Sequence, residues 1–354
     1  MKKILFVAAS AILLAAGCQK TEVLNQAIGD PMTFSTGMGK LTKADSDPVA
    51  TQELKDQGFK TWVYAAYADT DNNIQIGSVY DNMSGLDVTF DKGKNAWVTT
   101  NDNEYFWPSN KNNLDFYAVS TKRWNYDPST DDLDINVSVT QVQKGENDQP
   151  TAINTTSMSV TGYKVNPNEA TDDLMISNFL RANSDSHTKS VPLHFKHALS
   201  KVRFAFNTNA ASDGEEDKVL VTSLKVSKLV TAGSLDVTQG TDALSLVWTP
   251  STNADDAVDF TANYTSNNTL QSGDPVEFTS WLVLPQNLTG VMATIGYKIN
   301  DRSFNYNFKL AIGDVTKWDC NQIITYNINL SPNKITFAPV VDPWEEVDDM
   351  TTNN

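Results

Sequence analysis

Two histidines separated by two residues form the first candidate metal site in the sequence. His194 and His197 would share one face of a helix, but on a strand their imidazoles point to opposite faces. Apolar residues take most of the odd positions from 191 to 199, which predicts a strand. We therefore predict no metal site at this motif. We interpret His197 as a histidine at the edge of a core with a satisfied hydrogen bond.

The candidate nucleophile of the sequence is a cysteine near its C-terminus. A catalytic thiol needs a base that ionises it, and no histidine lies near Cys320 in the sequence. We interpret Cys320 as a structural thiol. The only other cysteine is Cys18, for which a lipid is predicted below, so we expect no internal disulfide.

Acidic clusters could bind calcium or act as paired acids and bases. Residues 69–73 begin like a calcium loop, but its sixth position is Ile74 and its twelfth is Tyr80, instead of glycine and glutamate. The acidic pairs at 131–132 and 345–346 are typical of solvated turns. The sequence contains no G-x-S-x-G motif. We predict no catalytic residue, no metal ligand and no cofactor, and hence no enzyme.

The N-terminus has the pattern of a bacterial lipoprotein signal. A short basic start precedes an apolar run of about 13 residues from 4 to 16, too short to span a bilayer as a helix. Small residues then lead to Cys18, as in a lipobox. We predict a signal peptide over residues 1–17 and a lipid on the Cys18 thiol, and Gln19 in place of Asp favours delivery to the outer membrane. The alternative is an ordinary secretory signal with an incidental cysteine.

Composition limits the partners of the chain. It has 354 residues, enough for about two domains, and a formal net charge of −16. Such a charge repels nucleic acid, so we expect no nucleic-acid partner. Solubility at a crowded surface is the ordinary role of such an excess of carboxylates.

Alternating apolar and polar residues predict an all-β fold. Strand patterns cover residues 133–139, 291–299, 304–308 and 324–330, and residues 62–67 are apolar on both faces, as in a central strand. Asn, Asp, Ser and Gly fill the gaps between these segments. No long stretch has helical periodicity, so we expect only short helices in connections.

Four stretches together resemble the fimbrillin family of Bacteroidales, the type V pilins. They are EYFWP with LDFYA at 104–108 and 114–118, DLMI with VPLHFKHALSKV at 173–176 and 191–202, WLVLP at 281–285, and ITF through VDPW at 335–344. They occur in order over nearly the whole chain. The resemblance implies two tandem transthyretin-like β-sandwich domains, at residues 44–187 and 188–354. A propeptide or tether at residues 18–43 would precede them.

The resemblance also implies a processing step. In the family, an Arg- or Lys-specific protease removes the N-terminal tail with the first strand, and a strand of the neighbouring subunit fills the groove. Here Met32, Thr33 and Phe34 would be the removable strand, and the bond between Lys43 and Ala44 would be cut. No arginine precedes residue 123, so a strictly Arg-specific protease could not cut here, and Lys40 is the other candidate.

The C-terminal segment leaves the position of the subunit open. Ile335, Phe337 and Val341 alternate, so they form either the last strand of the second domain or a donor strand. Only 11 residues follow Pro343, whereas stalk subunits of the family carry a longer two-strand appendage. A tip or accessory subunit is therefore at least as well supported as a stalk subunit.

We thus predict a structural or adhesive fimbrial subunit that reaches the cell surface as an outer-membrane lipoprotein precursor. Its expected partners are other fimbrial subunits, the outer membrane through the lipid, and a receptor on a host or bacterial surface. The alternative is a surface glycan-binding lipoprotein of a nutrient-uptake system. Such a protein would keep its N-terminus at Cys18, stay monomeric, and change its Trp fluorescence with a polysaccharide.

Overall fold

The computed structural model describes residues 31–38, 60–68, 79–94, 96–100, 103–108, 112–121, 134–139, 156–165, 167, 173–185, 190–209, 217–239, 244–265, 269–332 and 334–344. The predicted signal peptide, Cys18, Lys43 and Ala44 lie outside these residues. The described chain is all-β, as predicted, with one short 3₁₀ helix, η2 (Ala254–Asp256). Within it, no helix reaches the length and apolarity of a membrane span.

The N-terminal part of the chain forms an eight-stranded sheet that closes on itself. Its order is β2 (Lys60–Tyr67), β3 (Val79–Asp91), β4 (Ala96–Thr99), β1 (Phe34–Met38), β10 (Val191–His197), β8 (Leu174–Ser177), β5 (Leu114–Thr121) and β9 (Leu180–Ala182). Strand β5 also pairs with β2, which makes the sheet a ring. Strands β8 and β9 pair with two successive parts of the other edge of β5. Apolar side chains from these strands form one core inside the ring.

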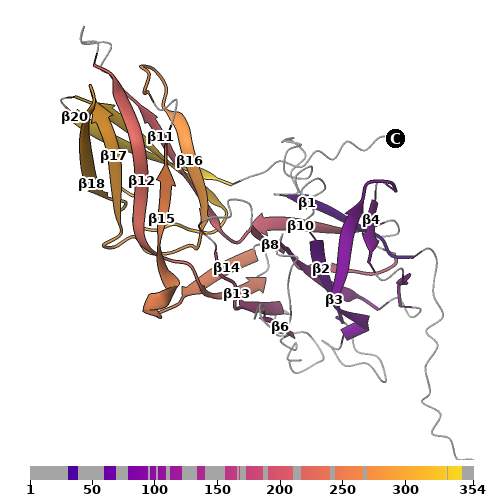
Figure 1. The fold of residues 1–354 in the computed structure, drawn as a ribbon. Coiled ribbons are helices and arrows are strands. Elements are labelled where there is room, and N and C mark those ends of the chain that lie inside the picture. The colour runs from indigo at the N-terminus through magenta and orange to yellow at the C-terminus, as the bar shows by residue number, and fades with distance from the viewer. Residues whose placement is uncertain are drawn as a thin grey trace, which may run out of the picture.

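The C-terminal part forms a β-sandwich, the lobe on the left of Figure 1. One sheet has the order β16 (Val276–Val283), β11 (Ser200–Asn207), β19 (Gln322–Ser331) and β20 (Lys334–Pro343). The other has the order β15 (Ala257–Asn263), β12 (Val219–Val230), β17 (Met292–Ile299) and β18 (Arg302–Lys309). Aromatic side chains from the two sheets contact each other in the interior of the sandwich. The ring centroids of Phe260 and Trp281 lie 5.7 Å apart, and those of Phe308 and Phe337 lie 4.4 Å apart.

A fourth sheet joins the two parts. Its order is β14 (Leu244–Pro250), β13 (Gly233–Gln239), β7 (Thr156–Thr161) and β6 (Asp134–Val139). Two of its strands come from the first half of the chain and two from the second, with Val160 opposite Leu235 at the junction. Both residues are buried in the same core as the sandwich.

The chain also passes directly from the ring into the sandwich. Strand β10 follows the domain boundary predicted after residue 187, yet it pairs with β1 and β8 inside the ring. It continues through Ala198 and Leu199, both fully buried, into β11 of the sandwich. The division into domains at residues 44–187 and 188–354 stays a prediction.

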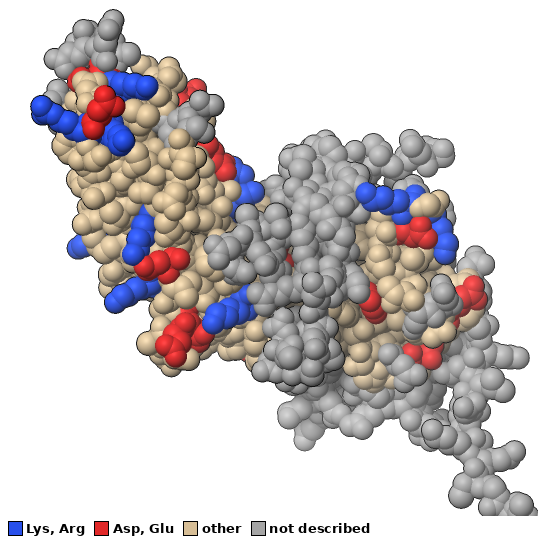
Figure 2. All heavy atoms as spheres, in the orientation of Figure 1, with Lys and Arg blue, Asp and Glu red and all other residues tan. Residues whose placement is uncertain are grey.

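Charges on the described surface are dispersed. On the face in Figure 2, Lys and Arg alternate with Asp and Glu in small groups, and no broad basic patch is visible. A basic stripe is the electrostatic footprint of nucleic-acid binding. This face of the described chain therefore offers no such footprint.

Candidate functional site

Strand β1 is the seam of the N-terminal ring. It pairs in parallel with β10 along its whole length, from Phe34 opposite Val191 to Met38 opposite Phe195. On its other side it pairs with β4 only where Phe34 meets Trp97. The ring therefore closes firmly on one side of β1 and through a single residue pair on the other, among the described residues.

Backbone alternation shows what β10 presents to β1. The Val191 N–H donates to the Thr33 carbonyl at 2.8 Å, and alternate residues of a parallel strand bond to the same neighbour. Residues Val191, Leu193 and Phe195 therefore face β1. His194 faces the β8 side, where its N–H donates to Asn178 Oδ1 at 3.1 Å and its carbonyl accepts from Asn178 N–H at 2.8 Å. Loss of β1 would leave the β10 edge unpaired.

Apolar side chains anchor β1 in its place. Met32 and Phe34 are 8% and 5% exposed, whereas Thr33 between them is exposed. The Met32 N–H donates to the Tyr105 carbonyl at 2.6 Å. The Phe34 ring belongs to the same core as Trp97. Burial of each large apolar side chain contributes about 1.5–3 kcal/mol, so the strand occupies an apolar slot.

The structure thus places the three residues predicted as the removable strand at the start of this seam. Met32 and Thr33 precede β1, and Phe34 is its first residue. The described strand extends four residues further, to Met38, than the predicted one. The cut at Lys43 and Ala44 and the lipid on Cys18 concern residues outside the described chain, and they stay predictions.

Substitution Phe34→Ala is expected to loosen the seam. Loss of a buried phenylalanine costs about 3–5 kcal/mol, and the β10 amides that face β1 should then exchange faster. Hydrogen exchange of residues 191–195 and chemical denaturation check this expectation, with Thr33→Ala, at an exposed position, as the matched control. Equal protection of β10 in both variants would show that Phe34 does not hold the seam.

The predicted C-terminal strand forms β20, at the edge of the sandwich. It pairs antiparallel with β19 from Lys334 to Pro343. Ile335, Phe337 and Val341 lie opposite buried β19 residues and so share the core face. Ile335 and Phe337 are half-buried, but Val341 is 42% exposed. The strand is therefore a member of its own sandwich and is incompletely covered by it.

A tryptophan at the end of β20 packs against β10 of the closed N-terminal sheet. Trp344 is 5% exposed, and its indole stacks on the His197 imidazole with centroids 3.5 Å apart and planes 8° from parallel. A hydrogen bond joins His197 Nδ1 to Asp173 Oδ2. Asn321 accepts from the backbone N–H of Trp344 at 2.8 Å and, through Oδ1, from that of His197 at 3.2 Å. We call these four residues the C-terminal clamp.

Only part of this clamp follows from the sequence. Strand parity predicts a histidine at the core edge with a hydrogen bond, and His197 has both properties. No spacing or pattern links it to Trp344, which lies far away in the sequence. In the described chain, no group of three or more His, Cys, Asp or Glu side chains could hold a metal ion.

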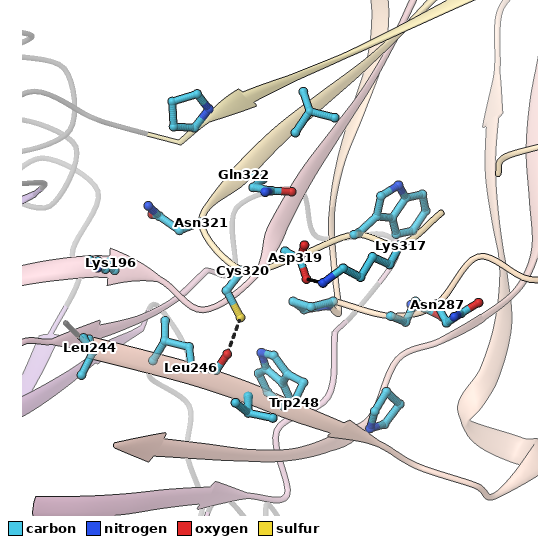
Figure 3. A pocket seen from close by; sticks show the side chains of 17 residues that line it. Lys196, Leu244, Leu246, Trp248, Asn287, Lys317, Asp319, Cys320, Asn321 and Gln322 are labelled. Carbon is cyan, nitrogen blue, oxygen red and sulfur yellow. Dashed lines mark hydrogen bonds and ion pairs between the residues drawn. The ribbon is translucent and has the colours of Figure 1, made fainter. Parts of the chain in front are cut away.

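Cys320 lines a groove of about 880 Å³ between β14 and residues 317–322, shown in Figure 3. Its Sγ donates to the Leu246 carbonyl at 3.6 Å. Burial, with a smaller effect of the Asp319 carboxylate, raises the pKa of the Cys320 thiol to about 12. A thiol with such a pKa is not a nucleophile at neutral pH, in agreement with the structural role predicted for it.

The indole N–H groups of the two tryptophans in this groove donate hydrogen bonds inside the protein. The Trp248 indole N–H donates to the Ala198 carbonyl at 2.6 Å, and that of Trp318 donates to the Tyr326 hydroxyl at 3.2 Å. Trp318 is 2% exposed and Trp248 is 9% exposed. Sugar rings stack on exposed aromatic faces, so these indoles provide no platform for a glycan.

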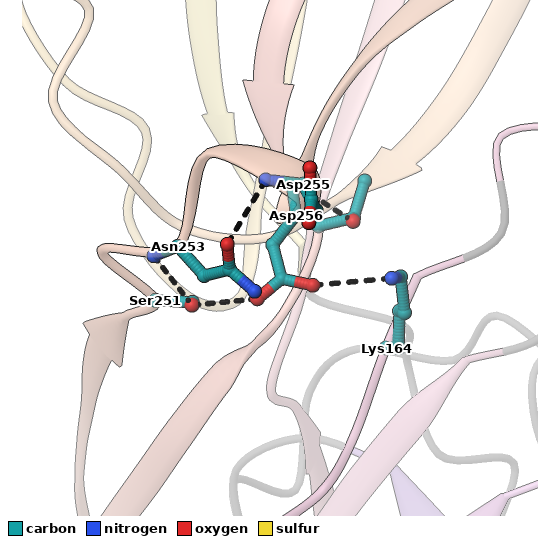
Figure 4. Close-up of polar contacts among 6 residues, drawn as sticks. Lys164, Ser251, Asn253, Asp255 and Asp256 are labelled. Carbon is teal, nitrogen blue, oxygen red and sulfur yellow. Dashed lines mark hydrogen bonds and ion pairs between the residues drawn. The ribbon is translucent and has the colours of Figure 1, made fainter.

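A second polar cluster is also structural. Lys164 Nζ lies 3.1 Å from Asp256 Oδ1, and the Ser251 hydroxyl donates to Asp256 Oδ2 at 2.6 Å (Figure 4). Ser251 and then Lys164 lower the pKa of the Asp256 carboxyl. Its small contribution to stability is therefore present above the ordinary carboxyl pKa and lost as the pH falls through the lowered one. The pair links residues from the two halves of the chain.

These features define an all-β protein in which β1 closes the N-terminal ring and no catalytic constellation is found among the described residues. The fimbrillin-like family model matches residues 42–344, so the chain belongs to the fimbrillin-like family. No curated protein matches the sequence.

Two solved structures share the fold. A fimbrial protein from Bacteroides vulgatus is 16% identical, with a TM-score of 0.57, and the match covers 89% of this chain and 100% of that one. A Bacteroides ovatus structure described in terms of cell adhesion is 12% identical, with a TM-score of 0.50, over 90% and 98% of the two chains. At these identities the likeness shows the fold alone.

Proposed function

We propose that the protein is a structural or adhesive subunit of a surface fimbria. It is exported as a lipoprotein through Cys18, cut by a trypsin-like protease between Lys43 and Ala44, and assembled by strand exchange. Membership of the fimbrillin-like family supports the fimbrial role. The observation that carries the mechanism is the seam at β1. Phe34 is buried in the slot, and Lys43, the predicted cut, lies nine positions further along the sequence.

Removal of β1 would create a site for another strand. The exposed β10 edge would present unpaired N–H and C=O groups beside an apolar slot, and such an edge recruits an extended segment. Main-chain hydrogen bonds supply the affinity, and alternate side chains supply the fit. Because head-to-tail pairing of this kind does not close, it builds a filament.

The N-terminal sequence and the intact mass of the protein from sheared surface material test this function. A lipid-free chain that starts at Ala44 is expected for an assembled subunit. A lipidated chain that starts at Cys18 would contradict the removal of β1 and would favour an anchored binding protein. Filaments and monomers from the same preparation should be compared, because only the assembled fraction must be cut.

Substitution Cys18→Ser is expected to prevent lipidation and to leave the precursor away from the outer membrane. The thiol is the only attachment point for the lipid in a lipobox, so the loss should be complete. Membrane fractionation and intact mass check this prediction, with Cys320→Ser as the matched control. Normal outer-membrane delivery of the Cys18 variant would refute the lipoprotein route.

A further inference from the structure

We propose that strand β18 of the C-terminal sandwich pairs with β18 of a second copy of this chain. The two strands would run antiparallel about a two-fold axis at Asn305, and their two four-stranded sheets would become one. Each copy keeps all of its own strand pairs in this contact. The slot of β1 takes no part in it.

Among the described edges of the sandwich, β18 alone lacks a feature that prevents pairing. These edges are β15, β16, β18 and β20, and natural sheets protect their edges with bulges and prolines. The pairs of β15 and of β16 each contain a register shift, and β20 carries Pro339 and Pro343. Strand β18 pairs with β17 over eight residues without a shift and contains no proline. It lies on the side of the sandwich away from the N-terminal ring (Figure 1).

The backbone of β18 has groups available for a further strand. The Leu310 N–H donates to the Val291 carbonyl at 3.1 Å, and the bonds of an antiparallel pair alternate along each strand. The even-numbered residues of β18 therefore bond to β17. Ser303, Asn305 and Asn307 direct their N–H and C=O groups to the other side, where no described strand pairs with β18.

Two aromatic side chains at this edge are incompletely covered. Phe304 and Tyr306 are 42% and 38% exposed, although they share a strand face with the buried Phe308. Tyr306 stacks on Phe337 of the opposite sheet with centroids 5.9 Å apart, so this is the inner face of the sandwich. A further strand beside β18 would cover both rings and extend the core.

The aromatic side chains select a register for a second copy of β18. With Asn305 opposite Asn305 of the second copy, Phe304 of each copy lies opposite Tyr306 of the other. These pairs occupy the positions without direct hydrogen bonds, where side chains of neighbouring strands are closest, and aromatic pairs there stabilise a sheet. A shift by one residue would place inner-face side chains opposite outer-face ones.

Charge complementarity agrees with the same register. Lys309 of each copy would lie opposite Asp301 of the other, and both side chains are exposed. A lysine on an edge strand usually prevents pairing, but here it would meet a carboxylate, while Arg302 lies on the opposite face of the sheet. A register centred on Tyr306 would place Lys309 opposite Ser303 and lose this ion pair. The second copy therefore supplies both the aromatic and the charged partners.

The contact is expected to be weak between two free subunits and stronger between filaments. A single pair of short strands buries less than the roughly 1,200 Å² of the smallest stable interfaces, so we expect a reversible dimer. In a filament many copies of the contact would act together. On the fimbrial function proposed above, β18 would thus join filaments side by side, through a two-fold contact that closes on itself.

The oligomeric state of the full-length Cys18→Ser chain tests the proposal. Sedimentation of this uncut, unlipidated chain from micromolar to millimolar concentration is expected to show a reversible dimer. Asn305→Pro should abolish the dimer, because proline removes the N–H that faces the partner and spares the bonds to β17. A chain that stays monomeric, or a dimer that Asn305→Pro leaves unchanged, would overturn the proposal.

Thr261→Pro is the matched control, on β15 at the other edge of the same sheet. Thr261 is exposed. The Tyr264 N–H donates to the Thr222 carbonyl at 3.0 Å, so by alternation the Thr261 N–H faces away from β12. This variant should keep the dimer, and thermal unfolding should show that both proline variants are folded. Loss of the dimer in both variants would contradict a contact at β18.

A disulfide tests the register without a proline. Directly opposite residues in a hydrogen-bonded pair have Cα atoms about 5.5 Å apart, within reach of a disulfide, so Asn305→Cys in the Cys18→Ser chain should link two copies on mild oxidation. Asn307→Cys is the matched control, since its two copies would lie four residues out of register, about 13 Å apart along the strands. No linkage at residue 305, or an equal yield at both positions, would overturn the register. Burial raises the pKa of the native Cys320 thiol, so it should not interfere.

A glycan is the other ligand that exposed aromatic rings could bind. Binding of a soluble glucan such as dextran to a monomeric chain, and its loss in Phe304→Ala, would assign this surface to a glycan and overturn the proposal. Failure of the dimer would leave strand exchange untouched, because that function is tested by the N-terminus of assembled subunits. A dimer of the uncut chain would likewise stand if strand exchange were refuted.

Discussion

Lys43→Gln is expected to leave export and folding intact and to reduce incorporation into filaments by about a hundredfold or more. Glutamine lacks the positive charge that a trypsin-like protease recognises, so β1 would stay in its slot. A second strand could enter only by expelling Met32 and Phe34, both buried. That expulsion costs about 3–6 kcal/mol, and each 1.4 kcal/mol corresponds to a factor of ten.

Quantification of the variant in sheared filaments and in the outer-membrane fraction checks this result. Lys40→Gln is the matched control, because Lys40 lies three positions before the expected cut and keeps Lys43 available. The control should assemble normally. Filaments that contain uncut Lys43→Gln subunits at the usual level would refute strand removal as the requirement for assembly.

Trp344→Ala is expected to free the end of β20 and to destabilise the chain by about 3–5 kcal/mol, the usual cost of removing a buried tryptophan. The indole stacks on His197, and Lys201 Nζ lies 5.8 Å from the ring centroid on β11. Val340 and Val341 are 43% and 42% exposed. The burial of Trp344 therefore contributes much of what holds this end of the strand.

Hydrogen exchange of residues 335–344, together with chemical denaturation, measures the effect. Trp344→Phe is the control, since a phenyl ring keeps part of the contact with His197 and should keep most of the protection. Unchanged exchange of residues 335–344 in Trp344→Ala would show that β20 is held by its pairs with β19 alone.

Local patterns predicted the strands well because alternation reports directly on a half-buried sheet. The described residues of the segments at 133–139, 304–308 and 324–330 fall in β6, β18 and β19. The same parity placed His197 correctly, since a strand separates the imidazoles of residues 194 and 197. These signals need only near neighbours in the sequence.

Long-range pairing could not be predicted in the same way. Strand β1 pairs in parallel with β10, more than 150 residues away in the sequence. No pattern in either segment predicts this pairing. Pro192 is also unusual in a central strand, because proline is normally found at sheet edges. The pairing tolerates it because the Pro192 nitrogen faces away from β1, by the alternation that Val191 establishes. The stacking of Trp344 on His197 depends likewise on the final placement of both segments.

The passage from β10 through Ala198 and Leu199 into β11 has a mechanical meaning. In the filament proposed above, tension would enter the subunit where the strand of the neighbouring subunit pairs with β10. It then runs along the covalent backbone into β11, which pairs in parallel with β19 from Ser200 to Asn207. Strand β19 shares its other edge with β20. A pull along this route loads many backbone hydrogen bonds in shear at the same time, which is the geometry in which a sheet resists rupture best.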